Sequence, residues 1–508
     1  MRVFRSVSFY PALFAIYPFL NIYANNFKRL TQGTDLILPA ALTLFITGVV
    51  WMGLAHLSYN TTKAALTTLI LQILFFSYGH VQNMLVDRLS LSMFTDSTLL
   101  MVWGVLLIIA LMLIWRAGNW LRMLMEPLNF TSIILLVIPL LSIFASSSHQ
   151  KPDRAYTDAL DINPMAAGYE QLPDIYYIIL DAFPNEKILH QFYSYDHHEF
   201  YRQLEEIGFY VAPDSYTNYL VTLSSLASAL NMQYTQVLLS ESWDSNSTDL
   251  TPLHQLIQDN IMCHTLRKIG YSYIIYDSTV EPTSISRCAD MRRGTDTISE
   301  LDMILLQSTL LKPFIQNWLR DDLREARRFI AEDLPTVAEM DEPTFTFAHI
   351  LLPHPPFVFD RYGNLLENPP ERVQIYTETA LTPEGKVFFL EQTLFTANLI
   401  LDSLRGILAQ SDAPPIIILQ SDHGSEPDVP WAIEKNFLAQ RMPILNAYYL
   451  PHGGTTDLYP SISPVNSFRV VLNYYFSAGL PYLDDYTYYS YGWSRQYYDL
   501  TDITGFLP

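Results

Sequence analysis

Cysteine and basic residues are both scarce in this chain of 508 residues. Cys263 and Cys288 are the only cysteines, so a zinc cluster built from cysteine ligands is excluded. In an oxidising compartment the two could form one disulfide, and two unpaired buried thiols are the alternative. Lysine and arginine number 30 against 51 acidic residues, which gives a net charge of −21. This argues against nucleic acid as a partner, because binding its phosphates needs clustered basic side chains.

Charged residues of either sign make up only 16% of the chain, and 50% of its residues are hydrophobic. The apolar residues gather in five nearly uncharged stretches at 8–24, 36–56, 64–79, 97–115 and 130–145. Most approach the roughly 20 residues that a helix needs to cross a bilayer, although the third and fifth are short. Five spans are expected, and four are the alternative. A cleaved signal peptide is the alternative for the first stretch, but no small-residue cleavage site follows it.

The basic residues in the connections predict which side of the membrane each connection faces. One side carries Arg2, Arg5, Lys63, Arg116 and Arg122, and the other carries Lys28, Arg29 and Arg88. By the positive-inside rule, the amino terminus is cytoplasmic. Five spans in the plasma (inner) membrane then place everything after Ser146 on the extracellular or periplasmic side.

Three regions follow from this pattern: a transmembrane domain at 1–145, a linker at 146–172 with loop chemistry, and a domain outside the cytoplasm at 173–508. Strand-like runs in the last region, at 174–180, 209–212, 271–276, 344–352 and 415–420, alternate with helix-like stretches at about 198–207, 252–268 and 386–409. The alternation predicts an α/β domain with a mainly parallel sheet covered by helices on both faces. Ligands of such sheets bind at the carboxyl ends of the strands.

Acidic and imidazole side chains stand at two of these strand ends. Asp181 directly follows the run 174–180, where a carboxylate can bind a cation or cap the next helix. Asp422 and His423 follow the run 415–420, and Gly424 lets the chain bend sharply after them. Adjacent Asp and His supply an oxygen and a nitrogen ligand from one turn. A structural Asp–His hydrogen bond is the alternative for this pair.

Thr222 lies at the start of a predicted helix of small and apolar residues. A hydroxyl there meets the positive end of the helix dipole, which favours anionic substrates. A bound metal could lower the pKa of that hydroxyl and make it a nucleophile. Capping of the helix by Thr222 or Ser224 is the alternative.

Prolines on both sides of His354, after the run 344–352, fix its backbone. That rigidity suits a group that holds a substrate oxygen, and a structural histidine is the alternative. His349 precedes it as a second candidate for substrate binding. Arg469, in the stretch 464–469, could contact an anion or anchor a helix.

Together these segments resemble the alkaline phosphatase and sulfatase superfamily, in particular its membrane-anchored branch with lipoteichoic acid synthases and phosphoethanolamine transferases. The resemblance is carried by Asp174-Ile-Tyr-Tyr-Ile-Ile-Leu-Asp181, by Thr222 with Ser-Leu-Ala-Ser228, by Leu-Leu-Pro-His354-Pro-Pro-Phe and by Gln-Ser-Asp422-His423-Gly. It covers roughly residues 170 to 480, and an anchor of about five spans before an external domain is also similar to that branch. It implies that the domain at 173–508 is a sulfatase-like catalytic domain with an alkaline-phosphatase-like fold.

The resemblance further implies a divalent metal ion held by Asp181, Thr222, Asp422 and His423, with Thr222 as nucleophile and His354 contacting the transferred group. Asp181 is a departure, because the anchored branch usually has Glu there. Mixed oxygen and nitrogen ligands favour zinc or manganese, with magnesium as the alternative.

The activity implied is transfer of a phospho-group from a phospholipid or phosphodiester donor to a glycan or lipid of the cell envelope. A phosphatase, phosphodiesterase or sulfuric ester hydrolase of the same superfamily is one alternative, and a non-catalytic membrane binding protein is another. Sulfatases present Cys or Ser in a C/S-x-P-S-R sequence, and Thr222-Leu-Ser-Ser-Leu226 has neither the proline nor the arginine. Sulfate ester hydrolysis is therefore disfavoured.

Overall fold

A computed structural model describes residues 8–26, 36–85, 89, 91, 93–147, 159–240, 243–366, 382–425, 427, 429, 433–491 and 496–507. The chain divides into two compact units, one of residues 1–153 with 298–318 and one of residues 154–297 with 319–508. Residues 148–158 of the predicted linker lie outside the described residues. So do five of the basic residues that predict the topology: Arg2, Arg5, Lys28, Arg29 and Arg88.

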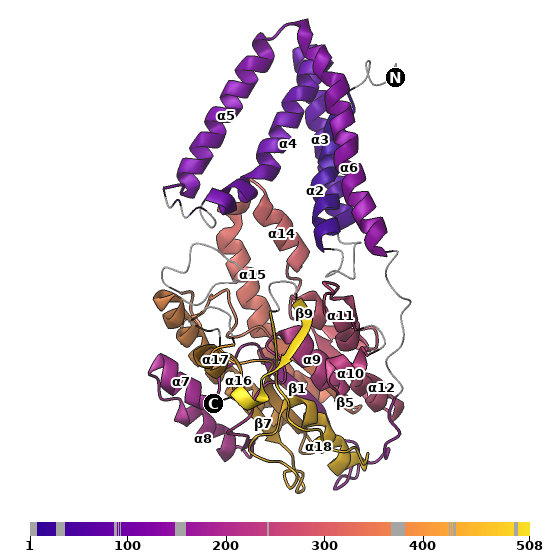
Figure 1. Cartoon of the computed structure of the whole chain (residues 1–508), viewed down its shortest axis with the longest axis vertical. Helices are drawn as coiled ribbons and strands as arrows, with labels where there is room; N and C mark the ends of the chain where they lie inside the picture. The colour runs from indigo at the N-terminus through magenta and orange to yellow at the C-terminus, as the bar shows by residue number, and fades with distance from the viewer. Residues whose placement is uncertain are drawn as a thin grey trace. The chain divides into compact units, whose positions relative to one another are not determined.

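Five apolar helices and a short 3-10 helix form the amino-terminal part of the first unit (Figure 1). They are α2 (Tyr10–Asn26), α3 (Ile37–Ser58), α4 (Thr61–Asn83), α5 (Asp96–Arg116), η3 (Asn119–Leu124) and α6 (Met125–Ser147). By length and composition, α3, α4, α5 and the segment Asn119–Phe144 could each cross a membrane, whereas α2 has 17 residues and contains Pro18. The expectation of five apolar helices is confirmed.

Helix α4 extends beyond the predicted stretch 64–79 at both ends, and polar side chains cap it and tie it to its neighbours. The side chain of Asn60 caps its first turn by accepting a hydrogen bond from the Lys63 amide at 3.0 Å. Further along, Gln72 Nε2 donates to Pro11 O and to Thr47 Oγ1, both at 2.9 Å. These bonds tie α4 to α2 and α3, so polar residues that interrupt the hydropathy pattern strengthen the helix packing.

Residues 298–318, which the predicted boundaries place in the catalytic domain, belong to the first unit. They form α14 (Glu300–Ser308) and the start of α15 (Lys312–Asp333). Helix α14 packs on α4 at Gly79, where a Cβ atom would lie 2.0 Å from Gln307 O. Glycine is therefore required there. The Leu310 amide donates to Phe75 O at 2.8 Å, which extends the contact.

The second unit is built on a seven-stranded sheet with the order β2-β7-β6-β1-β5-β3-β4. The central strand β1 (Ile175–Leu180) runs parallel to β5 (Thr344–Ile350) and β6 (Ile416–Ser421), and β5 runs parallel to β3 (Ser272–Tyr276). The strand β4 (Met291–Arg293) extends this parallel set, while β7 (Asn446–Tyr449) is antiparallel to β6 and to β2 (Tyr210–Val211). The mainly parallel sheet is confirmed.

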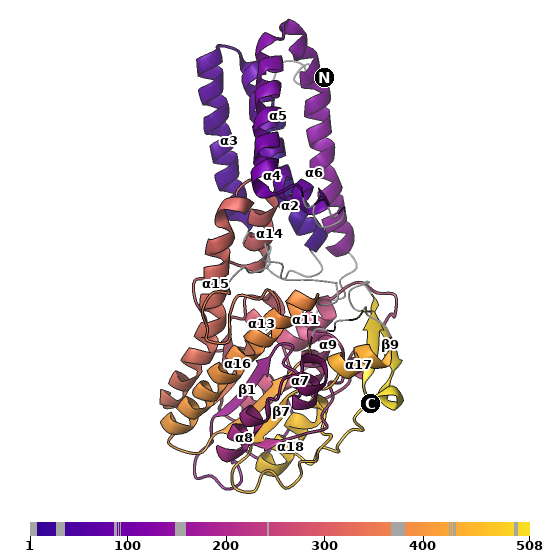
Figure 2. The same ribbon diagram turned by 90° about the vertical axis from the view of Figure 1, so that its left-hand side faces the viewer.

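Helices cover both faces of this sheet (Figure 2). Alternate residues of β1 point to opposite faces: Tyr177 and Ile179 join one buried cluster, and Tyr176 and Ile178 join the other. The first face is covered by α9 (Thr222–Asn231), α11 (Thr251–Gln258), α12 (Ile261–Lys268) and α18 (Pro464–Phe476). The second is covered by α8 (His198–Glu206), α15, η4 (Leu334–Glu339) and α16 (Pro383–Gln410).

One detail differs from the sequence-based expectation, whereas the helix predicted at about 386–409 is present as part of α16. The stretch 252–268 forms two helices, α11 and α12, because Asn260 caps a new helix by accepting from the Cys263 amide at 2.8 Å. Helix α16 is long and apolar enough to cross a membrane, but its apolar side chains are buried against the sheet. The remaining elements are α7 (Glu186–Tyr193), α10 (Thr235–Leu238), α13 (Glu281–Ser284), α17 (Lys435–Arg441), β8 (Tyr488–Tyr491), β9 (Gln496–Asp502) and η6 (Thr504–Phe506).

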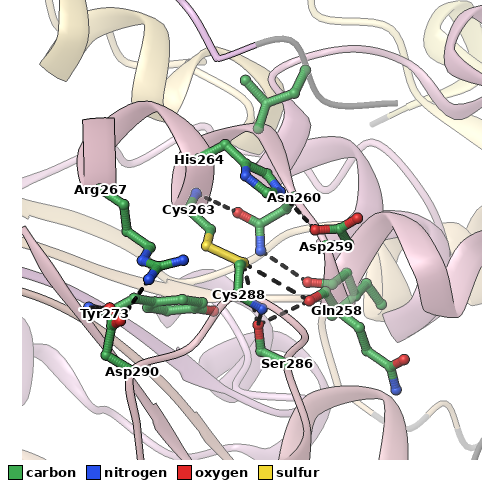
Figure 3. The surroundings of a disulfide bond; sticks show 12 residues. Gln258, Asp259, Asn260, Cys263, His264, Arg267, Tyr273, Ser286, Cys288 and Asp290 are labelled. Carbon is green, nitrogen blue, oxygen red and sulfur yellow. Dashed lines mark hydrogen bonds and ion pairs between the residues drawn. A yellow bond between two sulfur atoms is a disulfide. The ribbon is translucent and has the colours of Figure 1, made fainter. Parts of the chain in front are cut away.

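Cys263 and Cys288 form a disulfide that ties α12 to the segment before β4 (Figure 3). Of the two expectations for these cysteines, one disulfide or two unpaired thiols, the structure contains the disulfide. An Asp259–His264 pair lies close by, with 2.6 Å between Asp259 Oδ1 and His264 Nε2. Because the Cys288 sulfur is bonded to Cys263, it is no thiolate ligand for a metal at this cluster.

Candidate active site

Asp181, Asp422 and His423 come together at the carboxyl ends of β1 and β6. The two strands pair in register from Ile175 with Ile416 to Leu180 with Ser421, so the residues that follow each strand meet at the same edge. His423 Nε2 lies 3.5 Å from Asp181 Oδ1 and 3.3 Å from Asp422 Oδ2. All three side chains are buried. The parallel pairing of β1 and β6 therefore brings side chains from two distant parts of the sequence into one cluster.

Main-chain groups fix the orientation of the Asp422 carboxylate. Its Oδ1 accepts hydrogen bonds from the amides of His423 at 2.9 Å and Ala182 at 3.2 Å. Ala182 adopts a left-handed conformation, with φ of 66°, which aims its amide at this oxygen. With Oδ1 held in this way, Oδ2 is the oxygen that faces His423.

Gly424 allows the turn after His423 to pack closely on its neighbours. A Cβ atom at this position would lie 2.5 Å from Pro443 O and 2.6 Å from Gln440 O. The Gly424 amide donates to Arg441 O at 2.7 Å, which holds the turn against the end of α17. A side chain here would displace the Asp422–His423 turn.

The donor set fits a divalent metal ion. Asp181 Oδ1 and Asp422 Oδ2 are buried and have no hydrogen-bond partner among the described residues. One ligand atom from each of Asp181, Asp422 and His423 lies within 4.8 Å of the others. Buried carboxylate oxygens without donors are costly unless a cation compensates them.

The charge state of Asp181 also suits metal binding. Burial by itself raises the pKa of the Asp181 carboxyl, but the neighbouring imidazoles of His354, His349 and His423 hold that pKa well below its usual range. The carboxyl is therefore ionised at neutral pH. An ionised carboxylate is the form that binds a metal.

Thr222 is the first residue of α9 and lies beside this cluster. The residue before the helix is Val221, and no side chain caps the helix there, so neither Thr222 nor Ser224 is its cap. Thr222 Oγ1 lies 3.5 Å from His423 Nε2, and the side chain is half-buried. The hydroxyl is thus next to the carboxylates and remains accessible.

His349 lies on β5 behind Asp181. Its Nε2 is 3.4 Å from Asp181 Oδ2, and its Nδ1 is 2.9 Å from Thr283 Oγ1. The ring is 1% exposed. His349 is therefore placed to orient Asp181, and its direct contact with substrate stays a prediction.

The loop after β5 presents His354, which is half-buried. Its Nδ1 lies 2.6 Å from Pro355 O, so Nδ1 carries the proton and Nε2 is left for other partners. The buried Gln392 of α16 donates from Nε2 to the carbonyl oxygens of Pro353 and His354 at 3.0 and 3.1 Å. The peptide bonds Leu352–Pro353 and Pro355–Pro356 are cis.

Three residues that support the site have no signal in the sequence. Thr283 holds His349, Gln392 holds the His354 loop, and Arg327 of α15 donates to three carbonyl oxygens of the same loop. An arginine inside an amphipathic helix looks like any solvent-facing one until the fold is known. None of these three residues directly follows a strand, so they cannot be predicted from the polar residues at strand ends.

Arg469 lies on α18 and binds main-chain oxygens. Its Nε and Nη2 donate to Met232 O at 3.0 and 2.6 Å, and its Nη1 donates to Pro481 O. These bonds secure the end of α9, which begins at Thr222. Contact of Arg469 with an anionic substrate stays a prediction.

No protein-family model and no curated protein matches the chain. Solved structures similar to it include phosphoethanolamine transferases and a phosphonate monoester hydrolase. The C-terminal periplasmic domain of EcEptC from Escherichia coli is 12% identical, with a TM-score of 0.47, over 69% of this chain and 98% of that one.

The integral membrane protein lipooligosaccharide phosphoethanolamine transferase A (EptA) from Neisseria meningitidis is 13% identical, with a TM-score of 0.40, over 93% of this chain and 95% of that one. The phosphonate monoester hydrolase of Agrobacterium radiobacter is 12% identical, with a TM-score of 0.40, over 65% and 83%. Phosphoethanolamine transferases are among the enzymes that the sequence resemblance names. Identities this low do not assign an activity to this chain.

Proposed function

We propose that this protein is a membrane-anchored, metal-dependent phospho-group transferase whose nucleophile is Thr222. The observation that carries the proposal is the position of Thr222 Oγ1, 3.5 Å from His423 Nε2 and beside two buried carboxylates. A nucleophile at a helix amino terminus, next to a compact set of metal ligands, suits phosphoryl transfer, because the helix end and a bound cation both stabilise negative charge.

Asp181, Asp422, His423 and Thr222 would hold the metal ion, with zinc or manganese favoured over magnesium by the mixed ligands. A divalent cation bound there would lower the pKa of the Thr222 hydroxyl and offset the negative charge of the phosphoryl oxygens. His349 and the amides of Ala182 and His423 keep the carboxylates oriented.

Thr222 Oγ1 loses its proton to solvent and attacks phosphorus. The Oγ1–phosphorus bond forms while the bond to the leaving alcohol breaks, and His354, as an imidazolium protonated on both ring nitrogens, donates its Nε2 proton to the departing oxygen. An acceptor hydroxyl then attacks the phospho-threonine and gives its proton to the unprotonated Nε2 of His354. The bond between phosphorus and Thr222 Oγ1 breaks, which restores Thr222 and gives the transferred product. With water as acceptor, the same residues make a phosphatase or phosphodiesterase.

The apolar helices of the first unit favour a transferase that uses a lipid donor. Four segments of that unit are long and apolar enough to cross a membrane, so the site would work beside a high local concentration of phospholipid. The acceptor would be a glycan or lipid of the cell envelope, reached from the extracellular or periplasmic side. A sulfatase is disfavoured, because Thr222 and Leu226 stand where a sulfatase has its modified residue and arginine.

The test uses the full-length chain in detergent with p-nitrophenyl phosphate, bis-p-nitrophenyl phosphate and p-nitrophenyl sulfate, with and without chelator. Thr222→Ala is compared with Thr382→Ala, which removes the same atoms from an exposed helix cap. We expect cleavage of a phosphate ester that chelator and Thr222→Ala each abolish and Thr382→Ala leaves unchanged.

Lipid transfer is measured in parallel, by following the headgroup of a labelled phosphatidylethanolamine in vesicles into an acceptor lipid. Activity that survives Thr222→Ala would refute the nucleophile assignment. Cleavage of the sulfate ester alone would favour the sulfuric ester hydrolase. An inactive protein that binds no metal would support the non-catalytic alternative.

A further inference from the structure

An apolar cavity of about 540 Å³ lies among the membrane helices of the first unit. In Figure 1, α4 lies between α5 and α3, and these three helices supply almost the whole wall. The wall includes Ile46 and Thr47 of α3, Leu71, Gln72 and Leu74 of α4, and Gly104 of α5. The proposed active site contributes none of them.

Three polar side chains of this wall donate within the protein, and Gln72 Oε1 is a buried acceptor with no partner among the described residues. Gln72 Nε2 donates to Pro11 O and Thr47 Oγ1, Thr68 Oγ1 donates to Ala64 O, and Trp103 Nε1 donates to Leu74 O, each at 2.9 Å. The wall therefore offers hydrocarbon to an occupant and little hydrogen bonding. Most of the wall offers a water molecule no polar partner, whereas a buried water needs several.

The cavity is accessible and lies at the depth of the bilayer interior. Ile46 and Gly104 are exposed, so the wall is not sealed. Thr47 and Gln72 stand near the middle of helices of 22 and 23 residues, which are about 33 Å and about 35 Å long at 1.5 Å per residue. A lipid headgroup does not reach the middle of a span of that length, whereas an acyl chain does.

A glycine on α5 keeps part of this space open. A Cβ atom added to Gly104 would meet nothing within 4 Å. Leucine, the residue that dominates the rest of α5, would fill the volume that glycine leaves. Interiors of folded proteins are close-packed, so an unfilled space of this size calls for an occupant from the surroundings.

We propose that this cavity binds one acyl chain of a bilayer phospholipid. The apolar wall favours a hydrocarbon ligand. At this depth in the bilayer, an acyl chain can reach the cavity and a lipid headgroup cannot, and Gly104 leaves space for it. Leu310, from the segment that packs on α4, contributes the part of the wall that does not come from α3, α4 or α5. This inference does not depend on the proposed phospho-group transfer.

The test places the full-length chain in nanodiscs of phosphatidylethanolamine and phosphatidylglycerol that contain a phosphatidylethanolamine with a mid-chain diazirine. After irradiation, mass spectrometry locates the adducts. We expect adducts on lining residues such as Leu71 and Leu74, and roughly tenfold fewer of them in Gly104→Leu, because the leucine excludes the chain. The matched control is Gly53→Leu on α3, where the added side chain also meets open space but does not line the cavity.

Unchanged adducts on Leu71 and Leu74 in Gly104→Leu would overturn the proposal, and so would an equal loss in Gly53→Leu. If Gly104→Leu does not fold, the wild-type map decides. Adducts confined to outward-facing residues such as Phe45 and Leu113, which are 69% and 66% exposed, would mean that lipid only surrounds the helices.

Discussion

The guanidinium of Arg327 donates to the carbonyl oxygen of His354 at 3.1 Å. It also donates to Pro356 O at 2.9 Å and Pro355 O at 3.2 Å, so one buried side chain binds three successive carbonyls of the loop that presents His354. Burial lowers the pKa of Arg327 to about 10, which leaves the guanidinium charged at neutral pH. The buried, charged side chain of Arg327 thus fixes the backbone of His354, the residue proposed to contact the transferred phospho-group.

Replacing Arg327 should reduce activity through His354. We expect Arg327→Gln to lower kcat for a phosphodiester by roughly 10- to 100-fold, because a displaced general acid loses much of its effect. In a protein that already carries His354→Ala, Arg327→Gln should lower kcat only slightly further. Steady-state kinetics of the two single variants and the double variant measure this coupling. Arg328→Gln, which removes an exposed arginine paired with Glu332, is the control. Additive losses would show that Arg327 acts on stability or elsewhere in the site.

Asp422→Asn should have opposite effects with and without metal. In the metal-free protein the change removes a buried charge that lacks a hydrogen-bonded donor on Oδ2, so thermal stability should rise or stay equal. With zinc or manganese at about 100 times its Kd, the wild type should gain about 2.7 kcal/mol, and the variant should gain almost nothing. Thermal unfolding with added metal and metal analysis by mass spectrometry measure both effects. If added metal stabilised Asp422→Asn as much as the wild type, the metal would bind at another site.

His197 should make the stability of the protein depend on pH. Burial against Phe200, at a ring distance of 5.1 Å, lowers the pKa of His197 from 6.5 to about 4. Between these values the unfolded chain binds a proton and the folded chain does not, so the free energy of unfolding falls as pH falls from 6.5 to 4. The loss is about 3 kcal/mol at most.

We expect His197→Phe to remove this part of the pH dependence, as measured by thermal unfolding in detergent between pH 4 and pH 7 at constant ionic strength. The neighbouring His198 is exposed and pairs with Glu186, so His198→Phe should keep the slope. Identical slopes in all three proteins would contradict the assignment.

Gly424→Ala should damage both stability and activity. Its methyl group would lie 2.5 to 2.9 Å from three carbonyl oxygens of residues 440, 441 and 443, and the resulting backbone shift should cost about 1–3 kcal/mol. Since the shift moves Asp422 and His423, metal affinity should fall as well. Gly505→Ala, where a methyl group meets open space, is the control for unfolding and metal binding. A wild-type metal affinity in Gly424→Ala would show that the turn tolerates the shift.

The fold was largely predictable because its signals are local. Apolar runs marked the membrane helices, and the strand-like run before Asp181 marked the central strand. The break at Asn260 was missed because a cap inside a continuous helical pattern looks like an ordinary polar residue. The role of residues 298–318 was missed because their apolar side chains are equally typical of a soluble helix, and only the tertiary packing shows which unit they join.

The cluster of Asp181, Asp422 and His423 was predictable for a different reason. Parallel strands bring their carboxyl ends to one edge, so two residue types at two strand ends suffice to predict proximity. The support from Arg327, Gln392 and Thr283 could not be predicted in this way. Their positions depend on how helices cover the sheet, and that packing leaves no period or motif in the sequence.

Residues 298–318 also affect how the protein responds to a protease. Leu301 and Leu305 are buried with Phe19, Ile22 and Leu36, so a segment from the middle of the chain is part of the membrane unit. A cut within residues 148–158 would sever the backbone after α6, yet it would not by itself separate the second unit from the first. The carboxy-terminal fragment would stay associated with the membrane until those leucines were withdrawn into water, and once released it would carry them exposed and prone to aggregation.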